Sequence, residues 1–254
     1  GDPYGGTLIF KDHGGEVEDL VFRNTNTHDH YVSVNGGNDR GKYFGSFDYY
    51  NEGGIIIGSS YKRYSGDLNG SYKIKPNIEV STGATFSTSS QLGTVASEVN
   101  TLYRSMALWP TFNPWLDSAK TKPNPGNGNG DGNPLYWLSR VARLNEVNRI
   151  TANASVKYDI IPGLYIKAGA YGYMFEALSQ SFQKSTQTYA QLYAVPPTFS
   201  TSRDAIMSFS RTFQQQYNLI ANYTKTFHDV HNVNVMLGTE YFGQKNLSMQ
   251  VYGQ

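Results

Sequence analysis

Two histidines near the start of the chain have the spacing that a metal site on a β-strand would use. His28 and His30 stand two residues apart, so their side chains would project from one face of an extended segment. No third ligand is apparent in the sequence, and an ordinary polar strand face is the preferred interpretation. We therefore expect no bound metal, and we interpret His228 and His231 as solvated residues beside a tight turn.

A second pattern, N-P-G-N-G-N-G-D-G-N at 124–133, resembles the start of a calcium-binding loop. The residues that match positions 1, 3, 5 and 6 of such a loop are Asn127, Asn129, Asp131 and Gly132. Position 12 would be Leu138 instead of Glu, so the bidentate carboxylate that completes the site is missing. A flexible loop rich in Gly and Asn is the better interpretation.

The sequence contains no convincing catalytic arrangement. The Gly-rich stretch G-G-N-D-R-G at 36–41 lacks the following helix that phosphate binding requires. Ser, His and Asp all occur, but without a nucleophile elbow or a pair of carboxylates in a suitable setting. The chain has no Cys, which excludes thiolate chemistry and disulfides. We expect neither an enzyme nor a bound cofactor.

Aromatic residues on a long connection, 91–146, are the candidate binding residues. They are Trp109, Phe112, Trp115, Tyr136 and Trp137. Exposed aromatic rings on a loop suit stacking on sugar rings or contact with a partner protein. The alternative, which we prefer, is that these rings pack the loop against its neighbours. The apolar spacing within 96–108 predicts a short helix in the same region.

The elements that carry these loops are long strands with strict alternation. One predicted strand covers 147–160, where polar and apolar residues alternate without interruption from Arg149 to Ile160. The other predicted strands cover 28–35, 42–50, 61–74, 78–89, 164–182, about 206–227 and 231–251. Many of these eight segments are far longer than the usual 5–6 residues of strands in soluble proteins. Length together with alternation therefore indicates a sheet that separates two different environments.

The connections alternate between tight turns and long links. The tight turns are G-G-N-D-R at 36–40, K-P-N at 75–77, I-P-G at 161–163 and H-D-V at 228–230. The long links lie between them, at 51–60, 91–146 and about 183–205. An up-and-down outer-membrane barrel sorts its connections in this way, with short periplasmic turns and long extracellular loops.

Composition supports a barrel wall over a packed core. The sequence has 26 Gly, 20 Tyr and 13 Phe among 254 residues, and little Leu. Ala, Gly and Tyr suit a thin apolar band with aromatic edges, so we expect lipid on the apolar side and water on the polar side. A formal net charge of +1 gives no indication of nucleic-acid binding, and no run of 18 apolar residues predicts a transmembrane helix.

Four segments resemble one transporter family. They are E-V-E-D-L-V-F-R-N (16–24), the run from H-Y-V-S-V-N-G-G to Y-S-G-D-L-N (30–69), N-P-L-Y-W-L (133–138) and H-N-V-N-V-M-L-G-T-E-Y (231–241). This pattern is similar to SusC-like (RagA-type) TonB-dependent transporters, the outer-membrane importers of glycans and oligopeptides in Bacteroidetes-type bacteria. Two departures are Leu20, where the family often has Trp, and Asp67, where it has Arg.

The resemblance implies a role as part of a larger barrel of roughly 22 strands around a plugged lumen. Residues 1–254 would be barrel wall, with 1–27 as a lead-in loop and 91–146 as a long extracellular loop. The family's plug, N-terminal domain and TonB box have no counterpart in the sequence. The implied partners are a SusD-like lipoprotein, TonB through the missing plug, an oligosaccharide or peptide substrate and outer-membrane lipid.

Two other functions stay open at this stage. Eight strands can also close into a complete small outer-membrane barrel that acts as a passive porin. A soluble β-sandwich that binds carbohydrate would use the same alternation, with both apolar faces turned toward a common core.

Overall fold

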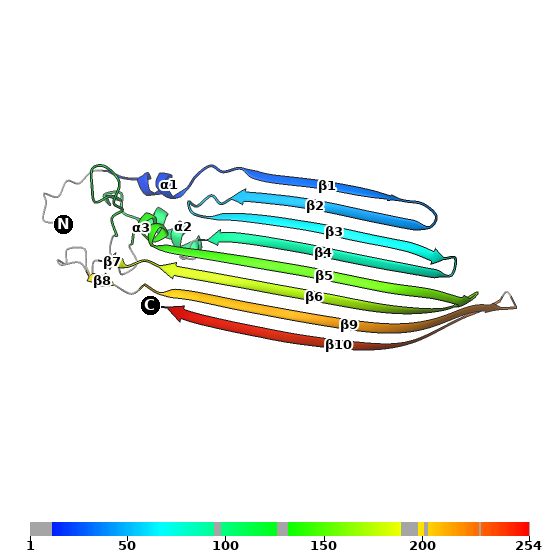
Figure 1. Ribbon diagram of the computed structural model, residues 1–254. Helices are drawn as coiled ribbons and strands as arrows, with labels where there is room; N and C mark the ends of the chain where they lie inside the picture. The colour runs from blue at the N-terminus through cyan, green and yellow to red at the C-terminus, as the bar shows by residue number, and fades with distance from the viewer. Residues whose placement is uncertain are drawn as a thin grey trace.

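The computed structural model describes residues 12–93, 98–125, 132–188, 198–200, 203–228 and 230–253. The chain forms one large antiparallel sheet with three short helices at one of its ends (Figure 1). The first three of the residues matched to a calcium loop, Asn127, Asn129 and Asp131, lie outside the described residues, as does the start of the predicted lead-in loop.

Eight strands follow one another across the large sheet in the order β1-β2-β3-β4-β5-β6-β9-β10. Their bounds are β1 Thr27–Gly37, β2 Gly41–Gly53, β3 Ser60–Lys75, β4 Ile78–Gly93, β5 Val141–Ile161, β6 Leu164–Gln183, β9 Ala205–Phe227 and β10 His231–Gly253. A separate hairpin joins β7 (Thr186–Thr188) to β8 (Thr198–Ser200). All eight predicted strands are thus confirmed, and β5 starts earlier than the predicted residue 147.

The sheet is open and has a single layer. Strands β1 and β10 are its edges, each hydrogen-bonded to one neighbour in the described part of the chain. Among the described residues no second large sheet covers either face, so these strands do not form a β-sandwich, and the eight strands do not close on themselves. Such long edges leave rows of backbone N–H and C=O groups unpaired, and a further strand on each side would pair them.

Register and alternation divide the sheet into two faces. Residues that pair directly across strands point to the same side, as do every second residues along a strand. One row shared by seven strands is Tyr43, Gly70, Thr82, Ala154, Ala170, Tyr217 and Tyr241. We call the side that carries this row the apolar face. The opposite side, which carries Asp48, Arg149 and Gln214, is the polar face.

The four tight turns lie at the same end of the sheet but are staggered (Figure 1). The number of strand residues between the row just named and the tight turn is two on β2, four on β4, six on β6 and ten on β10. Eight extra residues span about 27 Å, while the six strand spacings between β2 and β10 span about 29 Å. If the turns share one level, the strands tilt by about 40°, which is the tilt of membrane barrels.

Glycine determines the conformation of the turn between β5 and β6. Gly163 has a φ of 86°, in the left-handed region that side chains with a Cβ rarely adopt. A Cβ at this position would also collide with the carbonyl oxygen of Thr224 on β9. The I-P-G turn predicted from sequence therefore needs its last residue for both backbone conformation and space.

Three helices form a small cap at the end opposite the tight turns. They are α1 (Glu16–Val21), α2 (Glu98–Ala107) and α3 (Pro134–Arg140). The helix α1 lies in a segment that was expected to be irregular, and α2 falls within the predicted 96–108. The buried apolar cluster of the described residues is in this cap and consists of Val17, Val21, Ile56 and Leu135.

Candidate functional site

The apolar face of the sheet is free of charged side chains over its middle. In the described strands, Lys, Arg, Asp and Glu on this face occur only toward its ends. Those near the helical cap are Lys62, Glu146, Glu176, Arg211 and Lys245, and those beside the tight turns are Lys75 and Lys225. Large apolar side chains between them are solvent-exposed, for example Leu237 at 72%.

The uncharged zone has the height of a bilayer core. On β5 it runs from Ile150 to Ile160, eleven residues whose ten steps rise about 33 Å along the strand. At a tilt of about 40° this corresponds to about 25 Å along the membrane normal, the height of the apolar band on outer-membrane barrels. On β5 the next residue on this face beyond that height is polar, Asn148.

Aromatic rings mark the end of this zone nearest the cap. Tyr49 and Tyr64 pack with ring centroids 5.0 Å apart, and Phe47 lies 6.5 Å from Tyr64. His30 stacks on Tyr49 at 6.2 Å, and His28 stacks on His30 at 6.3 Å. The two histidines thus lie on the apolar face, as part of a stack of rings. In the described residues no group of three potential ligands lies close enough to hold a metal ion.

The polar face carries cross-strand networks of charged and hydroxyl groups. Arg63 on β3 donates to Asp48 on β2 at 2.9 Å, and the Ser65 hydroxyl donates to the same carboxylate at 3.1 Å. One strand further, Thr85 on β4 donates to Asp67 on β3 at 2.8 Å. Charged and hydroxyl groups of this kind would be costly to bury in an apolar protein core. The polar face is therefore suited to contact with water.

Three aromatic side chains in succession give β6 a different surface on the polar face. They are Tyr171, Tyr173 and Phe175, and the Arg149 guanidinium lies 5.3 Å from the centre of the Phe175 ring. Amide side chains continue the surface on the neighbouring strands, where Gln214 donates to Gln244 at 3.0 Å. Rings and amides of this kind suit contact with sugars or peptides. None of the aromatic residues predicted for binding belongs to this group, because that prediction concerned aromatic rings on a long connection and not on strands.

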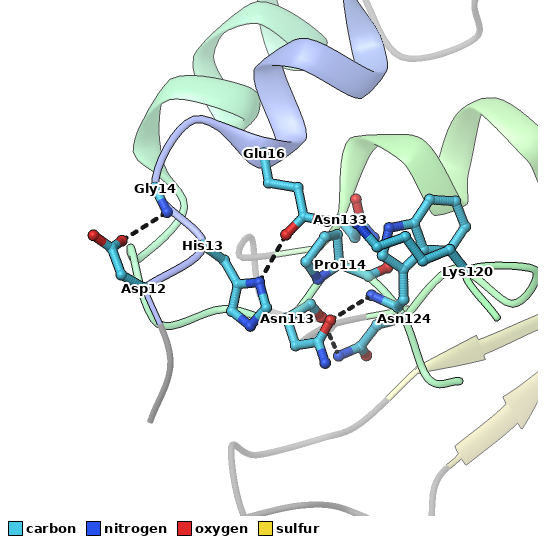
Figure 2. A network of polar contacts seen from close by, with 10 residues as sticks. Asp12, His13, Gly14, Glu16, Asn113, Pro114, Lys120, Asn124 and Asn133 are labelled. Carbon is cyan, nitrogen blue, oxygen red and sulfur yellow. Dashed lines mark hydrogen bonds and ion pairs between the residues drawn. The ribbon is translucent and has the colours of Figure 1, made fainter. Parts of the chain in front are cut away.

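Asn133 organises the helical cap. Its side chain is fully buried, its Oδ1 accepts from the backbone N–H of Leu135 at 3.1 Å, and its Nδ2 donates to the carbonyl of Pro114 at 3.0 Å. The first contact caps the N-terminus of α3, and the second ties that helix to a loop 19 residues earlier. Figure 2 shows Asn133 beside Pro114 in this network.

A second set of polar contacts joins α1 to the same loop. His13 Nδ1 lies 2.7 Å from Glu16 Oε2, and Lys120 Nζ lies 2.6 Å from Glu16 Oε1 (Figure 2). The hydrogen bonds from Lys120 and His13 lower the pKa of the Glu16 carboxyl below its ordinary value. Nearby, the Thr121 hydroxyl and backbone N–H groups lower the pKa of Asp117.

The five aromatic residues predicted for binding all lie in the cap region but not on one surface. Tyr136 is 2% exposed, and Trp137 packs edge-on against it with ring centroids 5.8 Å apart. Phe112 and Trp115 pack against the buried apolar cluster. Trp109 is 51% exposed and is free to contact a partner. The binding role of this group stays a prediction, which for the packed members competes with a structural role.

No helix among the described residues has the length and apolar character needed to cross a membrane. No protein-family model matches the chain, and a search of curated proteins gives no match.

The fold matches solved structures of RagAB. One structure of the RagAB peptide transporter aligns with a TM-score of 0.70 at 19% identity, covering 98% of this chain and 28% of that chain. The RagAB peptide importer in its "closed-closed" and "open-open" states aligns with a TM-score of 0.72 at 18% identity, covering 99% of this chain and 28% of the other.

This chain therefore spans about 28% of the length of the solved chains that it matches. At these identities the likeness concerns the fold. It confirms the resemblance found in the sequence at that level: the eight long antiparallel strands correspond to part of a SusC-like (RagA-type) TonB-dependent transporter.

Proposed function

We propose that these strands form part of the barrel wall of a TonB-dependent outer-membrane importer. The observation that carries the proposal is the contrast between the two faces of one open sheet. The apolar face of β5 carries no charge from Ile150 to Ile160, a height that matches the lipid core, while the polar face carries charged networks at the same height. The apolar face then contacts lipid, and the polar face lines the lumen.

The substrate that we infer is an oligopeptide or an oligosaccharide. The RagAB structures are those of a peptide importer, which favours peptides. The rings of Tyr171 and Tyr173 with the neighbouring Gln214 would contact either class, because aromatic faces stack on sugars and on peptide planes and amides donate and accept hydrogen bonds. Glycan uptake rests on the family resemblance alone.

The partners that we infer are a SusD-like lipoprotein above the helical cap and TonB in the periplasm. RagAB is a complex of two kinds of chain, which supports the first partner. In this arrangement the cap, at the end opposite the tight turns, faces the cell exterior and meets the lipoprotein. TonB would act on a plug, and it enters the proposal through the family resemblance.

Uptake in the native bacterium tests the proposal. The gene that encodes the full-length protein would be deleted and restored, and import of fluorescent oligopeptides and oligosaccharides would be followed with and without a protonophore. We expect deletion to abolish import of one class, restoration to recover it, and the protonophore to block it. Import that continues without the proton gradient would indicate a passive pore and would contradict the proposal.

A further inference from the structure

Lys62 occupies an unusual place on the apolar face. It lies on β3, two residues beyond the ring of Tyr64 and four beyond Gly66, in the direction of the cap. The rise per residue and a tilt of about 40° place its Cα about 5 Å above the aromatic rings and about 10 Å above the row of Phe86. In a membrane this is the level of the lipid headgroups of the outer leaflet.

The lysine borders a shallow hollow on this face. The hollow has a volume of about 300 Å³, and the residues that line it are Lys62, Tyr64, Thr88, Ser89, Ser90, Glu146 and Asn148. Thr88 donates to Asn148 at 2.7 Å across the β4–β5 pair. Hydrogen-bond donors and acceptors thus line a surface that faces outward, away from the proposed lumen.

The charged side chains on this part of the apolar face are Lys62 on β3 and, on the other side of the hollow, Glu146, Glu176 and Arg211. The carboxylate of Glu176 is already paired with Arg211, with Nη2 and Oε1 2.5 Å apart. Glu146, at the far wall of the hollow, lies two strands from Lys62, and no ion pair joins the two within the described residues. In the part of the chain that the structure describes, the solvent-exposed Lys62 ammonium therefore has no carboxylate partner on its own face.

The histidine stack lies two strands from Lys62, on the side away from the hollow. His28 pairs with Asn51 and Asn51 with Lys62, so the imidazole lies in the same register row as the ammonium. A neutral imidazole has one N–H donor, and a lysine has three. Donors above an aromatic girdle and without a carboxylate partner fit an anionic group that sits at a fixed height, which is the geometry of a lipid phosphate.

We propose that Lys62, with the hydroxyl-bearing residues Thr88 and Ser90 of the hollow, binds the phosphate of an outer-leaflet glycolipid. The inference rests on the proposed function, because it requires the apolar face to lie in the outer membrane. The sugar of such a lipid would meet Ser90, Asn148 and the Glu146 carboxylate, which can accept hydrogen bonds from hydroxyls. A lipid held there would fix the wall strands next to their neighbours.

The test uses the full-length protein in nanodiscs of phosphatidylcholine, with and without lipid A, and counts bound lipid A by native mass spectrometry. We expect Lys62→Gln to weaken retention of lipid A about fivefold, the effect of one lysine at a lipid surface. Lys62→Arg keeps the charge and should retain most of the binding. Lys73→Gln, on the polar face of the same strand, is the matched control and should leave binding unchanged.

Equal retention of lipid A by the wild type, Lys62→Gln and Lys73→Gln would overturn the inference. Displacement of lipid A by inorganic phosphate that is equally easy from the Lys62→Gln variant and from the wild type would also overturn the inference. Quenching of tyrosine and tryptophan emission by brominated phosphatidylcholine reports separately on insertion. Protein that inserts but ignores lipid A contradicts this inference alone, whereas protein that does not insert contradicts the proposed function.

Discussion

The sheet and the helical cap are held together in different ways. The cap buries Val21 and Asn133 completely and has an apolar cluster at its centre. The eight strands form a single layer whose large apolar side chains, such as Leu237, remain exposed on the chain alone. The cap is stabilised by its own packing, whereas under the proposed function the sheet needs lipid on one side and further strands at its edges.

A charge in the middle of the apolar face should have the largest effect. Ala154→Arg places a guanidinium on β5 about halfway between the tight turn and the aromatic rings. We expect a loss of about 2–4 kcal/mol in the free energy of unfolding in lipid vesicles, because the charge would lie at the bilayer midplane. Urea unfolding of the full-length protein followed by tryptophan emission measures it.

The matched control is the next residue, Asn153→Arg, which points to the polar face. It should insert and unfold like the wild type. Equal destabilisation by both substitutions would show that the two faces of the strand do not differ in environment.

The turn glycine should have the next largest effect. Gly163→Ala forces a Cβ into the left-handed region and against the Thr224 carbonyl, and we expect it to cost about 1–3 kcal/mol. Gly172→Ala on β6 is the control, since a Cβ there meets no atom within 4 Å. Thermal unfolding of both variants in the same detergent makes the comparison, and equal transition temperatures would refute the steric account.

Within the cap, Asn133→Ala should cost about 1–2 kcal/mol. The change removes the N-cap of α3 and one of two donors to the Pro114 carbonyl, which keeps the Asn124 backbone N–H at 2.8 Å. Amide hydrogen exchange should accelerate in α3 while β5 and β6 keep their protection. Faster exchange throughout the sheet would mean that the cap and the sheet unfold as one unit, contrary to the contrast drawn above. Asn113→Ala, at an exposed position of the same loop, is the control.

Acid should weaken the cap by a smaller amount, below about 1 kcal/mol, because the ion pair involved is partly exposed. The pKa of Glu16 is lowered in the folded cap, so its contribution is complete above the ordinary carboxyl pKa and disappears as the pH falls through the lowered value. Glu16→Gln should remove this pH dependence. Hydrogen exchange of α1 at several acidic pH values measures both proteins, and identical profiles would contradict the assignment.

The sequence predicts the sheet far better than the cap. Alternation is local, so each strand can be found from its own residues, and even the stagger of the turns is visible in strands that lengthen from 11 residues in β1 to 23 in β10. The apolar and polar faces follow from the same alternation once one strand is assigned.

The features that sequence analysis missed depend on contacts between distant residues. Nothing near Asn133 indicates that it reaches Pro114, and the short α1 is stabilised by packing against Ile56 and Leu135. The row of Tyr171, Tyr173 and Phe175 alternates with Ala170, Gly172 and Met174, so each face of β6 could have been taken as the apolar one. Only pairing with β5, where the faces are unambiguous, assigns the rings to the polar side.

Site-directed labelling along β5 tests most directly the central claim that one face of the sheet contacts lipid and the other contacts water. Since these residues contain no Cys, each introduced cysteine would be the one labelled within them. Single cysteines from Ile150 to Ile160 in the full-length protein would be exposed in cells to a water-soluble maleimide, and in vesicles to nitroxide lipids that quench an attached fluorophore. We predict that the even-numbered positions resist the maleimide and are quenched by lipid, and that the odd-numbered positions are labelled and not quenched. Equal labelling and equal quenching at neighbouring positions would contradict the assignment of lipid to one face and water to the other.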